Sequence, residues 1–281
     1  MTERFGERAR VALEAHGPLC VGIDPHAALL AAWGLTADAA GVREFGLRTV
    51  EAAAGRAGLV KPQVSFFERY GAAGFAALEE VLAAARAAGL LVIADAKRGD
   101  IGSTMADYAQ AWLPAGAPLE ADALTVNPYL GVGALEGAFA LAEEHGKGLF
   151  VLAATSNPEA TVLQRARTAD GETVSAAVVA EVSRRNATTT PEGEWGSFGF
   201  VIGATVDAAE AGLAPFAPVA PILAPGFGAQ GATPVDLTRR FGSLAGSVIA
   251  SESRSLLSAG PAALAETIAD RAAQYREVSR G

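Results

Sequence analysis

Four charged residues lie within six positions at the end of one apolar segment. Asp95, Lys97, Arg98 and Asp100 follow the run LLVIA, which has the composition of a buried strand. Residues two apart on a strand point to the same side, so the carboxylate of Asp95 and the ammonium of Lys97 are expected side by side. Taken alone, Asp-x-Lys-x-x-Asp is also compatible with a solvated strand end, whose ion pairs contribute about 0 to 1 kcal/mol.

Two neighbouring apolar segments end in further charges. Lys61 lies in LVKPQVSF, and Asp24 directly follows PLCVGI. If all these segments end at one edge, two lysines and two carboxylates form an alternating chain. Each contact of about 4 Å is then worth about 4 kcal/mol before desolvation at an effective dielectric of about 20. Such a chain keeps both lysines protonated and both aspartates ionised.

A candidate anion site lies near the C-terminal end of the sequence. The segment APGFGAQGA contains Gly226 and Gly228, which free the backbone to turn amide N–H groups towards an anion, and Gln230, a side-chain donor. Arg254 follows the next apolar segment and offers a forked guanidinium. Either piece alone could be a glycine-rich turn or a solvated arginine, but together they predict a phosphate site.

These residues must be positioned by a regular alternation of strands and helices. Apolar strand-like runs cover residues 18–24, 59–66, 90–97, 123–129, 148–156, 198–205, 221–227 and 246–253. Helical candidates lie between them at 38–58, 72–88, 104–112, 132–145 and 172–186, and another follows at 261–278. Eight such units predict a (β/α)8 TIM barrel, whose loops after strands seven and eight are a recurrent phosphate site. An open doubly wound sheet is the alternative, but VGIDPHAALL lacks its G-x-G-x-x-G fingerprint.

The organisation of the chain follows from the same pattern. No linker divides the sequence, so we expect one domain over residues 1–281, with residues 1–17 as an N-terminal lead-in helix. Residues 157–196 form an extended loop and helix region after strand five, and 157–170 are a candidate lid. Ser156, at the end of that strand, is placed to hydrogen bond with a polar ring.

Composition excludes several classes of function. A net charge of -9 argues against a nucleic-acid binder, and no run approaches the ~20 apolar residues of a membrane span. The first residues lack the apolar core of a signal peptide, and the single cysteine, Cys20, suits a reducing compartment. We therefore expect a cytoplasmic protein. His16, His26 and His145 lack metal-ligand spacing, so no metal site is expected.

The motifs together resemble the orotidine 5′-phosphate decarboxylase family, in particular its longer bacterial form. The contiguous match is DAKRGDIGST, and it is joined in the expected order by Lys61, PGFGAQG and Arg254. The resemblance implies a TIM barrel that converts orotidine 5′-monophosphate to UMP and CO₂, the last step of pyrimidine nucleotide synthesis. It also implies that no cofactor or metal takes part.

The resemblance implies a role for each motif residue. Asp95 would face the carboxylate that is lost, and Lys97 would protonate C6. Asp100, with Ile101 and Thr104 beside it, would complete the site of the other subunit in a homodimer. Lys61 would be catalytic as part of the charge chain and would also bind the ribose hydroxyls together with Asp24. The other substrate-binding residues would be Ser156 for the pyrimidine, and Gly226, Gly228, Gln230 and Arg254 for the phosphate. Ser253 stands where many members of the family have glycine.

Two alternatives remain at this point. The related 3-keto-gulonate-phosphate decarboxylases and hexulose-phosphate synthases share Asp-x-Lys-x-x-Asp but use Mg²⁺, held partly by a glutamate at the end of strand two. Here that position resembles Lys61, which would repel the ion. The other alternative is a non-catalytic barrel that binds a nucleotide phosphate.

Overall fold

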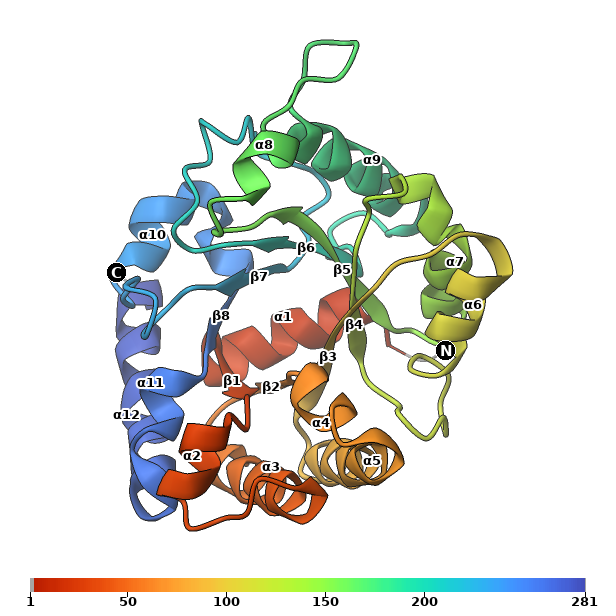
Figure 1. Cartoon of the computed structure of the whole chain (residues 1–281). Coiled ribbons are helices and arrows are strands. Elements are labelled where there is room, and N and C mark those ends of the chain that lie inside the picture. The colour runs from red at the N-terminus through yellow and green to blue at the C-terminus, as the bar shows by residue number, and fades with distance from the viewer. Residues whose placement is uncertain (1–2, 281) are drawn as a thin grey trace.

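Eight parallel strands form a closed barrel in the computed structural model, which describes residues 3–280 (Figure 1). Each strand pairs with the next in sequence, and β8 pairs with β1 to close the ring. The strands are β1 (Leu19–Ile23), β2 (Leu59–Pro62), β3 (Leu91–Arg98), β4 (Ala123–Val126), β5 (Gly148–Ala154), β6 (Phe198–Ile202), β7 (Ile222–Pro225) and β8 (Val248–Glu252). The predicted TIM barrel is therefore confirmed, and the open-sheet alternative is wrong.

Helices surround the ring of strands (Figure 1). The long ones are α1 (Phe5–His16), α3 (Ala39–Ala53), α5 (Gly71–Ala87), α6 (Gly102–Gln110), α7 (Glu136–Glu144), α9 (Val174–Thr189) and α12 (Gly260–Arg280). The short ones are α2 (Ala27–Ala32), α4 (Ser65–Glu68), α8 (Ala160–Gln164), α10 (Asp236–Phe241), α11 (Arg254–Leu257) and the 3₁₀ turns η1 (Val132–Leu135) and η2 (Gly242–Ser247). Apart from η1, which begins the candidate helix at 132–145, the apolar pattern did not predict them. They lie at strand ends, where loop chemistry rather than helical periodicity decides the conformation.

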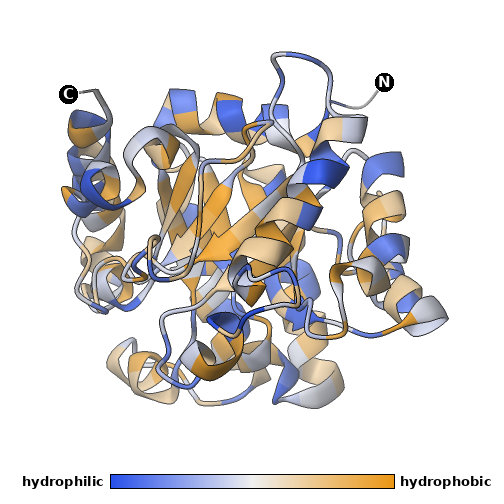
Figure 2. Ribbon diagram, turned by 90° about the horizontal axis from the view of Figure 1, so that it is seen from above, coloured by the Kyte–Doolittle hydropathy of each residue, from blue (hydrophilic) through white to orange (hydrophobic). Residues whose placement is uncertain are grey.

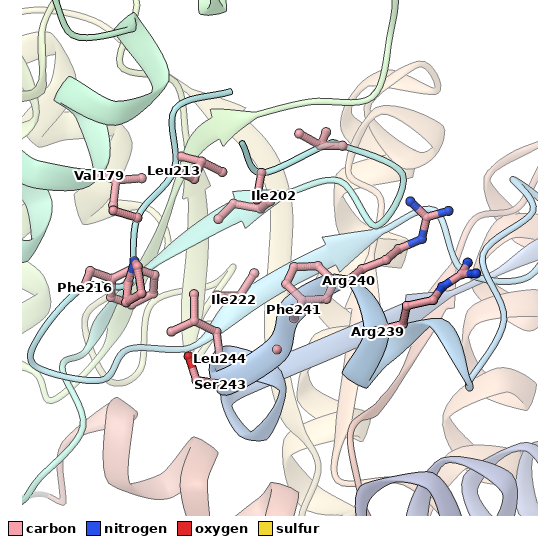
Figure 3. A pocket seen from close by; sticks show the side chains of 15 residues that line it. Val179, Ile202, Leu213, Phe216, Ile222, Arg239, Arg240, Phe241, Ser243 and Leu244 are labelled. Carbon is pink, nitrogen blue, oxygen red and sulfur yellow. The ribbon is translucent and has the colours of Figure 1, made fainter. Parts of the chain in front are cut away.

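The connection from β6 to β7 contains no helix in its described residues 203–221. Pro215, Pro218 and Pro221 interrupt this segment, and proline removes the N–H group that a helix interior requires. An apolar cavity of 270 Å³ remains between the connection from β6 to β7 and the outer face of the barrel, with Arg239 and Arg240 at its edge. Figure 3 shows both guanidinium groups pointing away from the apolar floor, and both pair with the carboxylate of Asp236. We interpret this cavity as a packing gap beneath a connection that has no helix to fill it.

The main core lies between the strands and the surrounding helices. Outward-facing strand residues such as Val21, Val92 and Leu124 are fully buried against it. Figure 2 shows apolar strands in the middle of the molecule and hydrophilic residues on the outer sides of the helices. The strands are thus buried on both faces, which accounts for their near-continuous apolar sequences.

The lead-in helix closes the N-terminal end of the barrel. Figure 1 shows α1 crossing the ring behind the strands. Its Phe5 is fully buried and meets the ring of Phe150, on β5, edge to face at a centroid distance of 5.8 Å. A side chain at Gly148 would overlap Phe5, so glycine there makes room for the ring. Helix α1 therefore fills the N-terminal end of the barrel interior, and the interior is open at the opposite end.

The segment after β5 contains more structure than a simple loop. Residues 157–196 include the short helix α8, an antiparallel bridge between Arg167 and Thr173, and then α9. Thr173 caps α9 by accepting a hydrogen bond from the N–H of Ala176 at 3.0 Å.

Among residues 3–280, no helix is long and apolar enough to cross a membrane.

Replacing Phe5 tests the closing role of α1. We expect Phe5→Ala to lower the free energy of unfolding by about 3 to 5 kcal/mol, because it empties a buried site enclosed by strands. Val11→Ala is the matched control, since Val11 lies on the same helix but is 49% exposed, and it should change stability by less than about 0.5 kcal/mol. Urea unfolding measures both. Equal effects of the two substitutions would contradict the role of Phe5 in closing the N-terminal end of the barrel.

Candidate active site

A cavity of 620 Å³ opens at the C-terminal ends of the strands. The sequence-predicted residues that line it are Asp24, Lys61, Asp95, Lys97, Ser156, Gly226, Gln230 and Arg254. They come from the ends of β1, β2, β3, β5, β7 and β8, which are far apart in sequence and meet only because the barrel is closed. The position is the one that TIM barrels use for catalysis.

Three charged groups form a chain at the centre of the cavity. The Nζ of Lys61 lies 3.0 Å from Oδ2 of Asp95, and the Nζ of Lys97 lies 2.6 Å from Oδ1 of the same carboxylate. Lys61 and Asp95 are buried, whereas the side chain of Lys97 is 46% exposed. Asp95 therefore bridges one enclosed ammonium and one that faces the cavity.

The chain holds Asp95 and Lys61 in their charged forms. Burial alone would raise the pKa of Asp95, but the attraction of Lys61 and Lys97 outweighs it and holds that pKa well below its usual range. Burial likewise opposes the charge of Lys61, yet Asp95 and Asp24 together raise its pKa above the ordinary lysine value. Asp95 is thus an ionised carboxylate and Lys61 a protonated amine throughout the neutral pH range.

Asp24 does not join this chain directly. No ion pair joins Asp24 to any described residue, so the first link of the predicted alternation is not a direct contact, although the charge of Asp24 still raises the pKa of Lys61. Strand register explains the difference: Lys61 is level with Gly22, so Asp24 lies further towards the mouth. One carboxylate oxygen of Asp24 is buried and has no hydrogen-bond partner within residues 3–280, which leaves it available to a ligand.

The end of β3 departs from regular strand geometry. Ala94 pairs with Leu124 and Arg98 with Val126, so three residues of β3 lie opposite the single residue Thr125 of β4. Bulges of this kind re-aim side chains next to active sites. Within residues 3–280, Lys97 is the one non-glycine residue with positive φ, at 48°, a backbone state that costs about 1 to 3 kcal/mol. Asp95 and Lys97 are thus held by an irregular strand end, where the sequence analysis expected simple alternation.

Thr125 is a site residue that the sequence analysis missed. Its hydroxyl donates to Oδ1 of Asp95 at 2.9 Å and accepts from the N–H of Lys97 at 2.9 Å. The available signal was a lone hydroxyl in the apolar strand ALTV. Gln63 and His26 were also missed and, unlike Thr125, they line the cavity. The amide of Gln63 donates to the backbone oxygen of Asp95 at 3.2 Å, and His26 packs against Phe66.

The predicted phosphate loop folds back on itself. The N–H of Gly228 donates to the carbonyl of Ala232 at 2.7 Å, and the N–H of Gly231 donates to Gly228 at 2.9 Å. Gly228 does not line the cavity, and a side chain there would overlap Ser255, so this glycine permits close packing. The expectation that Gly228 presents its amide to an anion therefore does not fit the geometry. Gly226, with φ 117°, does line the cavity.

Gln230 and Arg254 are the predicted phosphate-binding side chains that line this end of the cavity. Arg254 forms no ion pair with any carboxylate among residues 3–280, so its guanidinium is free for an anion. The end of β8 is anchored by Glu252, which is 1% exposed. Glu252 accepts hydrogen bonds from Ser255 at 2.6 Å and from the hydroxyl of Tyr275 at 2.7 Å, and it also pairs with Arg271.

Ser156 lies on the opposite wall, at the start of the 157–196 region. The neighbouring Thr155 is held by Gln164 of α8, whose amide accepts from the Thr155 N–H at 2.8 Å and donates to its hydroxyl at 2.9 Å. A further ion pair joins Arg165 to Glu210 in the connection after β6, at 2.7 Å. The candidate lid is thus tied to the end of β5, where Thr155 lines the cavity, and to the connection after β6.

Asp100, Ile101 and Thr104 lie outside the cavity of their own chain. The carboxylate of Asp100 accepts from the N–H of Ile101 at 2.8 Å, and the Ile101 side chain is 61% exposed. No group of three or more histidine, cysteine or acidic residues among residues 3–280 is arranged to hold a metal ion.

Known proteins resemble this chain over almost its full length. The family model described as "Orotidine 5'-phosphate decarboxylase / HUMPS family" matches residues 17–268. A Streptomyces coelicolor protein named orotidine 5′-phosphate decarboxylase is 53% identical over 273 residues, covering 96% of this chain and 95% of its own. A Corynebacterium efficiens protein of the same name is 51% identical and covers 93% and 92%.

Solved structures agree with these matches. The crystal structure of a Streptomyces avermitilis protein assigned to the same activity is 48% identical, has a TM-score of 0.93, and covers 99% of this chain and 97% of its own. A Leishmania donovani OMP decarboxylase is 29% identical with a TM-score of 0.72, covering 98% and 99%. This chain therefore belongs to the orotidine 5′-phosphate decarboxylase / HUMPS family.

Proposed function

We propose that this chain converts orotidine 5′-monophosphate to UMP and CO₂. The observation that carries the proposal is the Lys61–Asp95–Lys97 chain at the mouth of the barrel, with a half-exposed ammonium beside an ionised carboxylate. Relatives about half identical over more than nine-tenths of the chain bear the name of this enzyme. The proposal makes the chain an enzyme of pyrimidine nucleotide synthesis, and we infer a cytoplasmic location from that biosynthetic role.

The substrate spans the cavity from its phosphate to its carboxylate. Arg254 and Gln230 bind the phosphate, with Gly226 close to it, and the forked guanidinium matches a phosphate dianion. Asp24 and Lys61 bind the ribose hydroxyls, and the unpartnered oxygen of Asp24 supports this assignment. Ser156 contacts the pyrimidine.

The chemical step depends on Lys97 and Asp95. Loss of CO₂ breaks the bond from C6 to the carboxylate carbon and leaves the electron pair on C6, where the ring π system cannot delocalise it. The ammonium of Lys97 stabilises this charge and donates a proton to C6. Asp95, kept ionised by its two lysines, lies beside the substrate carboxylate and raises the energy of the ground state relative to the transition state.

The Mg²⁺-dependent alternative is less compatible with the donor set. The position at the end of β2 is Lys61, whose raised pKa keeps it positively charged. A cation at that point would repel Mg²⁺, which prefers oxygen ligands. A non-catalytic nucleotide-binding barrel is opposed by the crowded Lys61–Asp95–Lys97 arrangement, because phosphate binding requires none of it.

We also propose that the enzyme is a homodimer in which Asp100 completes the partner's site. Asp100 and Thr104 lie outside their own cavity, and exposed apolar side chains lie on nearby loops. These are Ile101, Tyr129 and Leu130, which are 61%, 72% and 53% exposed. An apolar surface next to a catalytic mouth suits burial against another protein chain.

Purified protein should consume orotidine 5′-monophosphate in the presence of EDTA. The measurement is the ultraviolet absorbance change that accompanies loss of the carboxylate, with UMP identified as product. A metal requirement would favour the Mg²⁺-dependent alternative, and UMP binding without turnover would favour the non-catalytic one.

Titration of Asp95 and Lys61 should not change kcat between about pH 5 and 9, because the pKa of Asp95 is lowered and that of Lys61 is raised.

Lys97→Ala should abolish turnover while retaining the affinity for UMP. Loss of the proton donor should lower kcat by at least about 100- to 10,000-fold, while the phosphate and ribose contacts keep the Kd for UMP within about tenfold. Lys97→Arg is the control for charge, because it preserves a cation beside Asp95 but gives up its proton poorly. Near wild-type turnover in either variant would rule out the role of Lys97 as proton donor.

Mixed subunits test the contribution of Asp100. Lys97→Ala and Asp100→Ala proteins should each be inactive alone, but their mixture should recover activity, since a mixed dimer carries one intact site. Random exchange predicts recovery to about one quarter of the wild-type rate. Differently tagged copies report subunit exchange. Exchange without recovery, or an active Asp100→Ala protein, would count against a shared site.

A further inference from the structure

We propose that Thr125 is a positioning residue that sets the catalytic geometry of both Asp95 and Lys97. This inference rests on the proposed function for its kinetic consequences, but the contacts that carry it do not. Thr125 lies on β4, is 1% exposed, and does not line the cavity. It therefore acts through the two charged residues and not on the substrate.

The first contact concerns the backbone of Lys97. In a regular parallel ladder the N–H of a strand residue donates to a carbonyl of the neighbouring strand. The bulge opposite Thr125 removes Lys97 from that ladder, and its N–H donates instead to the Thr125 hydroxyl at 2.9 Å. The hydroxyl thus satisfies a backbone donor at the residue whose φ is 48°. Without an acceptor at this point, the left-handed conformation of Lys97 loses the hydrogen bond that its N–H makes to β4.

The second contact concerns the carboxylate of Asp95. A hydroxyl has a single proton, and an ionised carboxylate can only accept. Because the Thr125 oxygen accepts from Lys97, its proton is directed to Oδ1 of Asp95, at 2.9 Å. The same Oδ1 accepts from the ammonium of Lys97 at 2.6 Å. One hydroxyl therefore joins the backbone of Lys97 to the carboxylate oxygen that its own side chain contacts.

The two contacts form a closed loop. It runs from the Lys97 N–H through Thr125 to Asp95 and returns through the Lys97 ammonium. Asp95 is also held from the other side by Lys61, at 3.0 Å, and at its backbone oxygen by Gln63. Thr125 is the member of this set that acts on both the main chain and the side chains of the bulge. The direction of the Lys97 ammonium towards the reacting carbon thus depends on it.

Thr125→Val tests the proposal because it removes the hydroxyl and preserves the shape. We expect kcat for orotidine 5′-monophosphate to fall about 10- to 100-fold, with KM changed by less than about threefold, since ribose and phosphate contacts do not involve Thr125. Thr125→Ser restores the hydroxyl and should recover kcat to within about fivefold of the wild type. An unchanged kcat in Thr125→Val, or no recovery in Thr125→Ser, would overturn the proposal.

A matched control separates positioning from general loss of a buried hydroxyl. Thr49 is also fully buried, and its hydroxyl donates to the carbonyl of Phe45 inside α3, away from the cavity. Thr49→Val should lower the thermal midpoint about as much as Thr125→Val, but it should leave kcat unchanged. An equal loss of kcat in both variants would mean that Thr125 has only a structural role.

Amide exchange tests the same contacts without using activity. In deuterated water the Lys97 amide should be protected in the wild type and in Thr125→Ser, and it should exchange at least about tenfold faster in Thr125→Val. Thr49→Val should leave it unchanged. If the wild-type protein fails to decarboxylate its substrate but shows this exchange pattern, the proposed function fails and the positioning role stands. Equal protection in all four proteins would overturn the positioning role itself.

Discussion

One buried carboxylate, shared by two ammonium groups, sets the conditions for the rest of this structure. Asp95 is 7% exposed and lies within 3.0 Å of Lys61 and 2.6 Å of Lys97. Removing such a carboxylate from water costs several kcal/mol, which only well-placed opposite charges and hydrogen bonds offset. Every surrounding contact must therefore be fixed, because a carboxylate that lost one lysine would be left buried and poorly compensated.

The barrel places the charged residues around Asp95 at one end and much of the packing that stabilises the fold at the other. Its N-terminal end is closed by α1, where Phe5 packs against Phe150 and Arg8 pairs with Asp122 at 2.6 Å. Asp122 also accepts the N–H of Val92 at 2.9 Å, so it ties the lower part of β3 to the start of β4. The lower half of β3 is thus regular and fully packed, while its upper half can deviate into the bulge without unfolding the strand.

The order of strands and the participating charges could be predicted from the sequence, because apolar runs and strand-end residues are local features. The register of parallel strands brings Lys61 and Asp95 to the same end of the barrel, whereas Lys97 contacts Asp95 from within the bulge. The contributions of Thr125 and Gln63 could not be predicted in this way, since their roles depend on which residue lies opposite a bulge. Gly228 was misjudged for a related reason: its conformational freedom was recognised, but the direction of its amide is set by the turn that returns to Ala232.

The exposure of the two lysines explains why one of them, under the proposed reaction, is the proton donor. Lys61 is enclosed, with 7% of its side chain exposed, whereas Lys97 is 46% exposed. A donor that has given its proton to C6 must be reprotonated before the next turnover, and that requires contact with water. Asp95 contacts the Lys97 amine at 2.6 Å, so its carboxylate remains beside that amine through this step. Lys61 keeps Asp95 ionised while Lys97 is neutral, so the enclosed lysine maintains the charge on which the exposed lysine depends.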